Sequence, residues 1–282
     1  LRDRYIHLRM ETSKYDMHID KPKKQSLFPD QDGGKSAVSY LKRISFDWDK
    51  VEDKNQYPFN VPALSRLDTL DLDNNVVFII GENGAGKSTL LEAISYQCGF
   101  SIGGGSRNND LGLTDKSVLL SSIMTLSWLP KVTRGFFLRA ETFFNFAQYL
   151  DEMAREHPAQ YEAYGGKSLN EQSHGEGFIS LFTHRFGGKS LYILDEPEAA
   201  LSPQRQFALL KIIHDLEQAN QAQFIIATHS PILMAYPGAL IYQCDEDGIH
   251  KINYKDTDHY RLTKAFLDNP DRFFRELFKE DE

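Results

Sequence analysis

The sequence predicts an α/β protein built on a mostly parallel sheet, and two observations carry this prediction. Four short apolar runs have the length and composition of buried strands: Val76–Ile80, Phe136–Leu138, Leu191–Leu194 and Phe224–Ala227. Segments with helical periodicity separate these runs, as shown by Leu90, Ile94 and Cys98, which follow one another at intervals of four. Strands that alternate with helices form parallel sheets, because each crossover helix returns the chain to the same edge of the sheet.

Composition excludes several classes of protein. The chain has 282 residues, of which 41% are hydrophobic and 26% charged, as expected of an ordinary globular protein. Its apolar runs fall well short of the roughly 18 residues of a membrane span, so it is not expected to be a channel or permease. A formal net charge of -8 argues against a protein that mainly coats nucleic acid.

The N-terminal part differs in charge from the rest. Residues 1–43 contain ten Lys and Arg against six acids, which leaves -12 for the remainder. We predict a basic N-terminal extension over residues 1–37 and a main domain over 38–282, whose first strand begins in the segment Ala37–Leu41. The extension is interpreted as a loosely packed segment or as a basic contact for a partner or nucleic acid.

Targeting and redox signals point to the cytoplasm. The two cysteines, Cys98 and Cys244, lie far apart without other ligands at metal-binding spacing, so neither a disulfide framework nor a zinc site is expected. The chain also starts without the charged and apolar pattern of a secretory signal.

One glycine-rich segment predicts a phosphate-binding loop. Residues Gly81–Thr89 read GENGAGKST and fit the pattern GxxxxGK[ST], between an apolar strand and an amphipathic helix. Three Gly-Gly-Lys-Ser segments resemble it but lack the first glycine, whose position holds Pro29, Tyr161 or Thr183.

The residue types of this loop suit a polyphosphate. Glycines let successive backbone N–H groups point at phosphate oxygens, and the following helix adds its positive end. Lys87 supplies a charge to the phosphates, and the hydroxyl of Ser88 is a Mg²⁺ ligand. The nucleotide-binding residues are therefore predicted to be Asn83, Gly84, Ala85, Gly86, Lys87, Ser88 and Thr89.

Two carboxylates end the strand Leu191–Leu194. Such a pair is costly to bury unless a cation neutralises it, so Asp195 is predicted to bind Mg²⁺ and Glu196 to activate a water molecule. A simple turn before Pro197 is the alternative. His229 follows the strand Phe224–Ala227, where a histidine can sense a terminal phosphate or serve only a structural role.

Together these segments resemble an ATP-binding-cassette (ABC) type P-loop ATPase over most of residues 38–250. Gln172–Gly177, about 20 residues before Asp195, corresponds to the signature loop of that family. Ser173 and Gly175 match it, whereas His174 and Glu176 replace a Gly and a Gln. The resemblance implies an ABC-ATPase head with N-terminal antiparallel strands and a helical signature subdomain, which we place at 142–187.

The resemblance also implies partners and cofactors. Family members sandwich ATP and Mg²⁺ between the phosphate loop of one subunit and the signature of another, so a homodimer is expected. Their additional metal-contacting Gln is absent, and Glu141 is its candidate substitute, with a plain surface carboxylate as the alternative.

The loop after Glu196 bears on the subfamily. Pro197–Pro203 reads PEAALSP and is similar to stand-alone ATPases related to RecF, the SMC proteins and the overcoming-lysogenisation-defect nucleases, and to short bacterial AAA-family ATPases. This similarity implies a head domain without a coiled coil, acting in DNA repair or phage defence through a separate effector protein, with DNA as a candidate partner and no membrane partner expected. The alternatives are the ATPase subunit of an ABC transporter and a slow ATP-binding regulatory module.

Three other features are weaker. Tyr57 and Phe59 are candidates for stacking on adenine, with core packing as the alternative. Arg107 lies in a glycine-rich loop that could approach the nucleotide or a partner, with a flexible surface loop as the alternative. The apolar helical tail over residues 257–282 is expected to pack on the main domain, with a partner contact as the alternative.

Overall fold

The computed structural model describes residues 39–101, 115–156, 166–171, 174–185 and 188–278. Within them, the main sheet has six strands in the order β5-β6-β7-β3-β8-β9. Five run parallel, and β9 (Gly248–Lys251) pairs antiparallel with β8. The parallel strands are β5 (Gly135–Arg139), β6 (Ser190–Asp195), β7 (Ala222–Ala227), β3 (Val76–Gly81) and β8 (Leu240–Asp245). This sheet confirms the predicted α/β class.

A second sheet is formed by the N-terminal half of the described chain. Its strands β2 (Thr69–Asp71), β1 (Leu41–Phe46) and β4 (Met124–Trp128) are antiparallel and lie in the order β2-β1-β4. The expected antiparallel strands are therefore confirmed. The first strand begins at Leu41, the last residue of the segment Ala37–Leu41 in which its start was expected.

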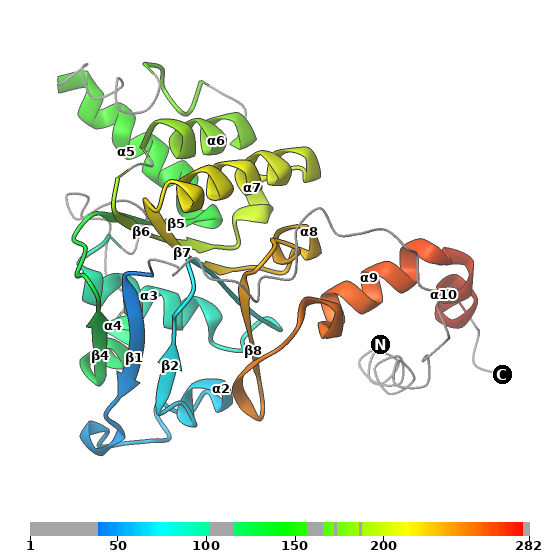
Figure 1. The fold of residues 1–282 in the computed structure, drawn as a ribbon, viewed down its shortest axis with the longest axis horizontal. Coiled ribbons are helices and arrows are strands. Elements are labelled where there is room, and N and C mark those ends of the chain that lie inside the picture. The colour runs from blue at the N-terminus through cyan, green and yellow to red at the C-terminus, as the bar shows by residue number, and fades with distance from the viewer. Residues whose placement is uncertain (1–38, 102–114, 157–165, 172–173, 186–187, 279–282) are drawn as a thin grey trace. The chain divides into compact units, whose positions relative to one another are not determined.

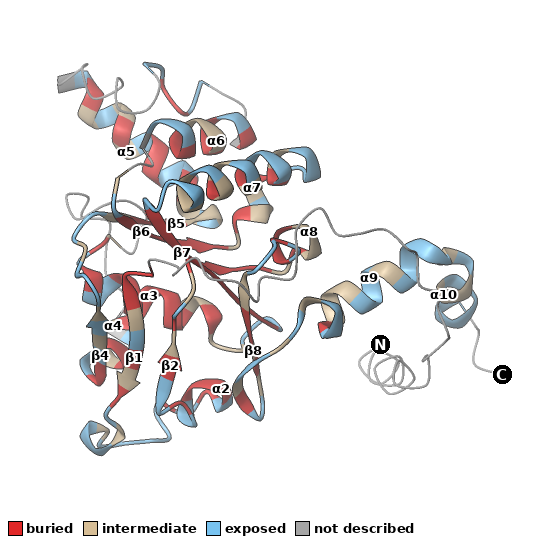
Figure 2. Cartoon of the chain, viewed as in Figure 1, coloured by how far each residue is buried: buried red, intermediate tan, exposed pale blue. Residues whose placement is uncertain are grey.

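The main sheet separates two apolar clusters. Along β3, Val77 and Ile79 belong to the cluster shared with the antiparallel sheet, whereas Val76, Phe78 and Ile80 belong to the other. Side chains of a strand alternate between its faces, so a strand buried on both faces reads as a continuous apolar run. Every residue of β3, β6 and β7 is buried, and these strands are red in Figure 2.

Helices cover both faces of this sheet (Figure 1). The face that carries the antiparallel sheet is also covered by α3 (Lys87–Cys98), α4 (Asp115–Ser122) and α2 (Pro62–Ser65). The predicted apolar stripe of α3, formed by Leu90, Ile94 and Cys98, is buried on this face. The opposite face is covered by α5 (Phe143–Glu156), α6 (His174–Arg185), α7 (Pro203–Gln218) and α8 (Pro231–Met234). The α5 and α6 helices lie in the segment where the helical subdomain was expected, and its boundaries at 142 and 187 stay a prediction.

The C-terminal tail forms α9 (Asp258–Asp268) and α10 (Pro270–Leu277). Packing of this tail on the main domain was the expectation, and it was wrong for most of its length, because neither helix contains a buried residue. Instead the two helices pack on each other, with the ring of Phe266 against those of Phe273 and Phe274. Leu267 is 69% exposed and Phe278 is 73% exposed.

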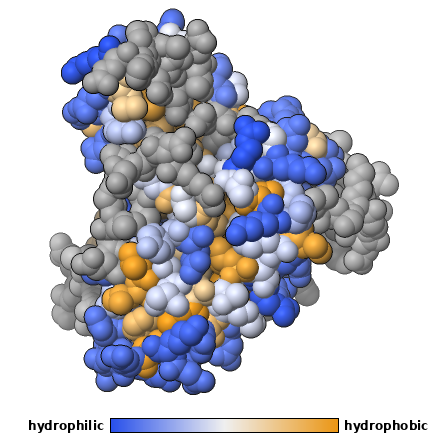
Figure 3. Space-filling model, turned by 90° about the vertical axis from the view of Figure 1, so that its left-hand side faces the viewer, coloured by the Kyte–Doolittle hydropathy of each residue, from blue (hydrophilic) through white to orange (hydrophobic). Residues whose placement is uncertain are grey.

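The surface is mixed in character. On the face seen in Figure 3, apolar patches lie among hydrophilic residues. None of the helices in the described residues combines the length and apolarity needed to cross a bilayer. The expected basic extension, residues 1–37, and Arg107 lie outside the described residues.

One buried amide joins the two sheets. The side chain of Gln223 on β7 is fully buried, and its Oε1 accepts hydrogen bonds from the backbone N–H groups of Tyr40 (3.0 Å) and Leu41 (2.8 Å). Its Nε2 donates to the carbonyls of Leu41, Leu72 and Asn74. The Gln223 side chain thus pairs with backbone groups of Tyr40 and Leu41, and β1 begins at Leu41.

We expect Gln223→Leu to lower the free energy of unfolding by about 3 kcal/mol, because it leaves several buried backbone groups without partners. Chemical denaturation measures the change. Gln221→Leu, two residues earlier and exposed, is the matched control and should change the value by no more than about 0.5 kcal/mol. Equal losses in both variants would contradict the bridging role of Gln223.

Candidate active site

The predicted phosphate loop lies between β3 and α3, and two of its glycines are required by its surroundings. Gly81 has φ 147°, and a Cβ atom there would lie 2.3 Å from the carbonyl oxygen of Cys244. Gly86 has φ 92° at the N-cap of α3, where a Cβ atom would lie 2.9 Å from Val61. Without side chains, these positions let the backbone turn sharply into the N-terminus of α3, where N–H groups attract anions.

Lys87 closes this loop on itself. Its side chain is almost fully buried, and Nζ donates hydrogen bonds to the carbonyls of Gly81 (2.9 Å) and Glu82 (3.0 Å). An ammonium group has three N–H donors, so one remains for a phosphate oxygen. Burial lowers the pKa of Lys87, and the nearby carboxylates of Glu196 and Asp195 oppose that shift.

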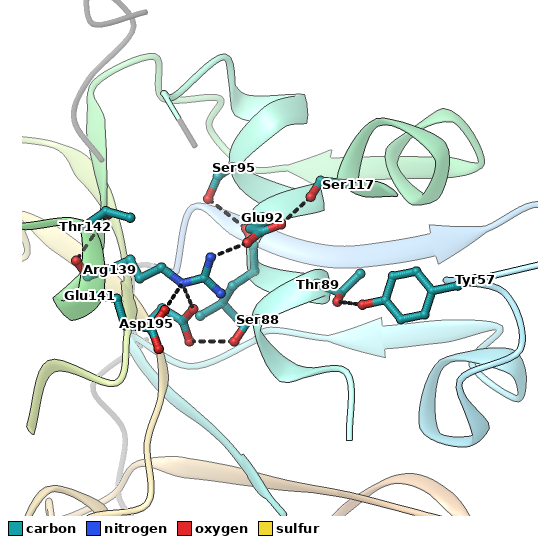
Figure 4. Close-up of polar contacts among 11 residues, drawn as sticks. Tyr57, Ser88, Thr89, Glu92, Ser95, Ser117, Arg139, Glu141, Thr142 and Asp195 are labelled. Carbon is teal, nitrogen blue, oxygen red and sulfur yellow. Dashed lines mark hydrogen bonds and ion pairs between the residues drawn. The ribbon is translucent and has the colours of Figure 1, made fainter. Parts of the chain in front are cut away.

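Asp195 lies at the end of β6 and is 2% exposed. Its Oδ1 accepts a hydrogen bond from the hydroxyl of Ser88 at 3.2 Å, and its Oδ2 lies 3.0 Å from Nε of Arg139. Figure 4 shows these side chains converging from α3, β6 and β5. The structure thus brings together the two predicted metal ligands Ser88 and Asp195.

Arg139 is the cation that balances this region. It donates to Oε1 of the buried Glu92 at 2.6 Å, and Glu92 also accepts a hydrogen bond from Ser117 on α4. Burial raises the pKa of Asp195 to about 6, while Arg139 and the Ser88 hydrogen bond act in the opposite direction. Two buried carboxylates therefore share one guanidinium.

The donor set at Asp195 fits Mg²⁺. A hydroxyl and a carboxylate are hard oxygen ligands of the kind that Mg²⁺ takes together with phosphates and water. Within the described part of the chain, Oδ2 of Asp195 is a buried atom that lacks a hydrogen bond of good geometry, although it faces Arg139. Such an oxygen has coordination capacity left for a cation.

Glu196 and His229, which follow the neighbouring strands β6 and β7, lie beside each other. Nε2 of His229 is 3.4 Å from Oε1 of Glu196, and the backbone N–H of His229 donates to Glu198 at 2.5 Å. Glu196 has φ 49°, a left-handed conformation that costs a non-glycine residue of order 1–3 kcal/mol and is frequent at functional sites. Its side chain remains 35% exposed.

Glu196 and the phosphate loop border one cleft of about 470 Å³, whose lining does not include Asp195 or His229. Its lining includes the predicted residues Asn83, Gly84, Gly86, Lys87, Ser88, Thr89, Glu141 and Glu196. Four residues outside the predicted motifs also line it: Tyr57, Glu92, Lys116 and Arg139. A cleft of this size with phosphate-loop donors on one side accommodates a nucleotide.

The two aromatic candidates for base stacking differ. Tyr57 lines the cleft, and its hydroxyl is 2.5 Å from Oγ1 of Thr89, with Nζ of Lys116 4.9 Å from its ring centroid. Phe59 is 7% exposed and packs edge-on against Trp48, so it belongs to the core. The structure therefore supports the core alternative for Phe59 and keeps Tyr57 at the cleft.

Glu141 lies at the rim of the cleft. It is 78% exposed, and its Oε2 is 4.0 Å from Nε of Arg139. Its assignment as a metal ligand stays a prediction.

The predicted signature residues do not line this cleft. Gly175 and Glu176 lie in the first turn of α6, and Glu176 pairs with Arg205 on α7 at 3.4 Å. The His174 side chain and all of Ser173 lie outside the described residues. Within one chain, the described signature residues thus form a separate group from the residues around Lys87.

Sequence reasoning missed Arg139, Glu92 and His259. Arg139 ends β5, a parallel strand adjacent to β6. Because the carboxyl ends of neighbouring parallel strands meet at one edge of a sheet, this position could have indicated that Arg139 lies near Asp195. Glu92 follows Ser88 by one helical turn, which also places it on the same side of α3. His259 lies on α9, far along the chain, and nothing in the sequence pairs it with His229.

Two family models match parts of the chain. A model described as "AAA domain, putative AbiEii toxin, Type IV TA system" matches residues 178–235, which include Asp195, Glu196 and His229. A model described as "AAA domain" matches residues 59–147, which include the phosphate loop.

Two curated relatives also align with parts of the chain. The chain is 28% identical over 159 residues to the zinc import ATP-binding protein ZnuC of Buchnera aphidicola, covering 56% of this chain and 64% of that protein. It is 46% identical over 48 residues to protein ea59 of Escherichia phage lambda, covering 17% and 9%. The chain spans less than two thirds of the length of either relative.

Among solved structures, the SMC head domain from Thermotoga maritima is similar with a TM-score of 0.41 and 15% identity. The match covers 76% of this chain and 99% of that chain.

We expect Arg139→Met to lower the free energy of unfolding by about 3 kcal/mol in metal-free buffer, because it removes the cation that two buried carboxylates face. Thermal or chemical denaturation measures the loss. Arg134→Met, at an exposed site just before β5, is the control and should behave like the parent. If the two variants were equally stable, Arg139 would not be the balancing charge.

Proposed function

We propose that this chain, an ABC-type P-loop ATPase, hydrolyses ATP with Mg²⁺ and uses ATP binding to join two copies of itself. One observation carries the proposal: Lys87, Ser88 and Glu196, from segments far apart in the sequence, border one cleft, and Asp195 lies directly behind it, bonded to Ser88 at 3.2 Å. Parallel sheets place ligands at the carboxyl edge of their strands, because loops and helix N-termini converge there.

Each residue has a defined task in this proposal. Residues Asn83–Thr89 bind the phosphates through backbone N–H groups, and Lys87 adds its remaining donor. Ser88 and Asp195 hold Mg²⁺, which would add positive charge to the phosphate oxygens. Glu196 orients a water molecule and accepts its proton. Nε2 of His229 lies 3.4 Å from Oε1 of Glu196 and stabilises negative charge at that carboxylate.

The separation of the signature residues supports the dimer. Gly175 and Glu176 begin α6 and do not line the cleft, so a second copy is needed to bring them to a phosphate. The N-terminus of a helix attracts anions such as a terminal phosphate. Ser173, His174, Gly175 and Glu176 of one subunit would thus complete the cleft of the other.

We further propose that the ATP-dependent dimer acts on another macromolecule in the cytoplasm, through a separate effector protein or on DNA, in DNA repair or phage defence. The loop Pro197–Pro203 and the toxin–antitoxin description of the family model over residues 178–235 support this role. A transporter ATPase subunit is the second candidate, because one relative is a zinc import ATP-binding protein. A slow regulatory ATP-binding module is the third.

We expect Glu196→Gln to bind ATP, to hydrolyse it at least about 100-fold more slowly than the parent, and to accumulate as a dimer, because the water-activating carboxylate is lost. Phosphate release measures turnover, and light scattering measures a mass twice that of the 32.3 kDa chain. Glu246→Gln, in an exposed turn, is the matched control and should retain the parental rate.

A second substitution tests the signature loop. Ser173→Arg should abolish the dimer of the Glu196→Gln variant while each subunit still binds ATP. A Glu196→Gln protein that stays monomeric with saturating ATP would contradict the dimer, whereas full hydrolysis by that variant would contradict the role of Glu196.

Affinity capture with the Glu196→Gln variant, from extract and from membranes, separates the effector, DNA and transporter roles.

A further inference from the structure

The C-terminal helix α9 places a second histidine against His229. His259 lies in the first turn of α9, and its Nε2 is 3.1 Å from Nδ1 of His229. The two ring centroids are 5.3 Å apart with an interplanar angle of 50°, so the rings meet through these nitrogen atoms and do not stack. The opposite nitrogen of His229, Nε2, lies 3.4 Å from Oε1 of Glu196 without the geometry of a hydrogen bond.

Several contacts fix His259 in this place. Thr257, the N-cap of α9, is fully buried and its hydroxyl oxygen accepts a hydrogen bond from the N–H of Tyr260. The hydroxyl of Tyr254 donates to the carbonyl of Pro231 in α8, which follows His229 in the chain. The start of α9 is therefore tied to the segment that carries His229, although the rest of the helix is exposed.

The hydrogen bond between the rings needs one donor and one acceptor. A neutral imidazole carries a proton on one nitrogen only, so the two rings have two possible arrangements. If Nδ1 of His229 were the donor, its Nε2 would carry a lone pair 3.4 Å from the carboxylate of Glu196, which is repulsive. If His259 is the donor, the proton of His229 lies on Nε2, and its partial positive charge is attracted to that carboxylate.

The surroundings of His259 favour its neutral form. Burial is the main cause that lowers the pKa of His259, and His229 and Lys87 lower it further, whereas Asp258 and Glu82 act against them. A neutral His259 has a single N–H, and its Nε2 is the atom next to His229.

We propose that His259 is a positioning residue that donates its Nε2–H to Nδ1 of His229 and so keeps the proton of His229 on Nε2, the nitrogen next to Glu196. His229 then offers a hydrogen-bond donor beside Glu196 without needing a positive charge. The effect on turnover rests on the proposed ATPase function, whereas the protonation pattern of the two rings does not.

The direct test is nitrogen NMR of ¹⁵N-histidine-labelled protein at a pH where His229 is neutral. The spectrum of His229→Asn identifies the His229 signals among the nine histidines. We expect the parent to show His229 protonated on Nε2. His259→Phe, which has no donor, should convert this signal to a mixture of the two tautomers, and His259→Gln, whose amide can donate, should keep the parental pattern.

The same variants test the consequence for catalysis. We expect His259→Phe to reduce kcat by at least about tenfold with little change in KM, because the orienting partner of a catalytic histidine is lost. His259→Gln should recover most of this loss. His250→Phe, in an exposed strand, is the control and should alter neither kcat nor the His229 signals.

The outcomes separate the two proposals. A His229 proton on Nδ1 in the parent, or an Nε2 proton that survives His259→Phe unchanged, overturns the positioning role. A parental protein with the expected His229 signal and no ATP hydrolysis overturns the proposed function and leaves the assignment of His259 standing.

Discussion

A carboxylate buried at the end of β6 is the constraint on which the described structure depends. Asp195 is 2% exposed, and an isolated ion at such a depth costs several kcal/mol unless a cation lies beside it. The protein supplies Arg139 from the adjacent strand, and Glu92 holds the guanidinium in place from α3. Glu92 is in turn bonded by Ser117 of α4. The relative positions of β5, β6, α3 and α4 therefore follow from one balance of charge.

This balance also positions the phosphate loop. Ser88 and Glu92 lie one turn apart on α3, and both reach the charged group around Arg139, so the helix is fixed in rotation at its N-terminal end (Figure 4). Gly86 begins the helix in a left-handed conformation, and Lys87 folds back on the loop. The donors for a phosphate are thus arranged by contacts within the protein, and ligand binding has little ordering entropy left to overcome.

The sequence predicts those parts of the molecule whose signals are local. Continuous apolar runs predicted β3, β5, β6 and β7, because strands buried on both faces need no polar side. The loop Gly81–Thr89 and the pair Asp195–Glu196 carry their chemistry in adjacent residues. Gln223 and His259 could not be found this way, because their partners are distant in the chain and polar residues of their type occur throughout it. The tail shows the same limit: its apolar periodicity predicts helices but not what covers them.

Glu196 is the point at which the separate constraints meet. Its left-handed backbone is held by hydrogen bonds from its N–H to the carbonyl of Ala227 and from the N–H of Ala199 to its own carbonyl. The carboxylate of Glu196 lies 3.4 Å from Nε2 of His229, and its side chain stays 35% exposed. A side chain fixed through its backbone and left without a short hydrogen bond keeps its lone pairs for an incoming donor. Preorganisation of this kind suits a group that must accept a proton from water, because no strong existing hydrogen bond has to break first.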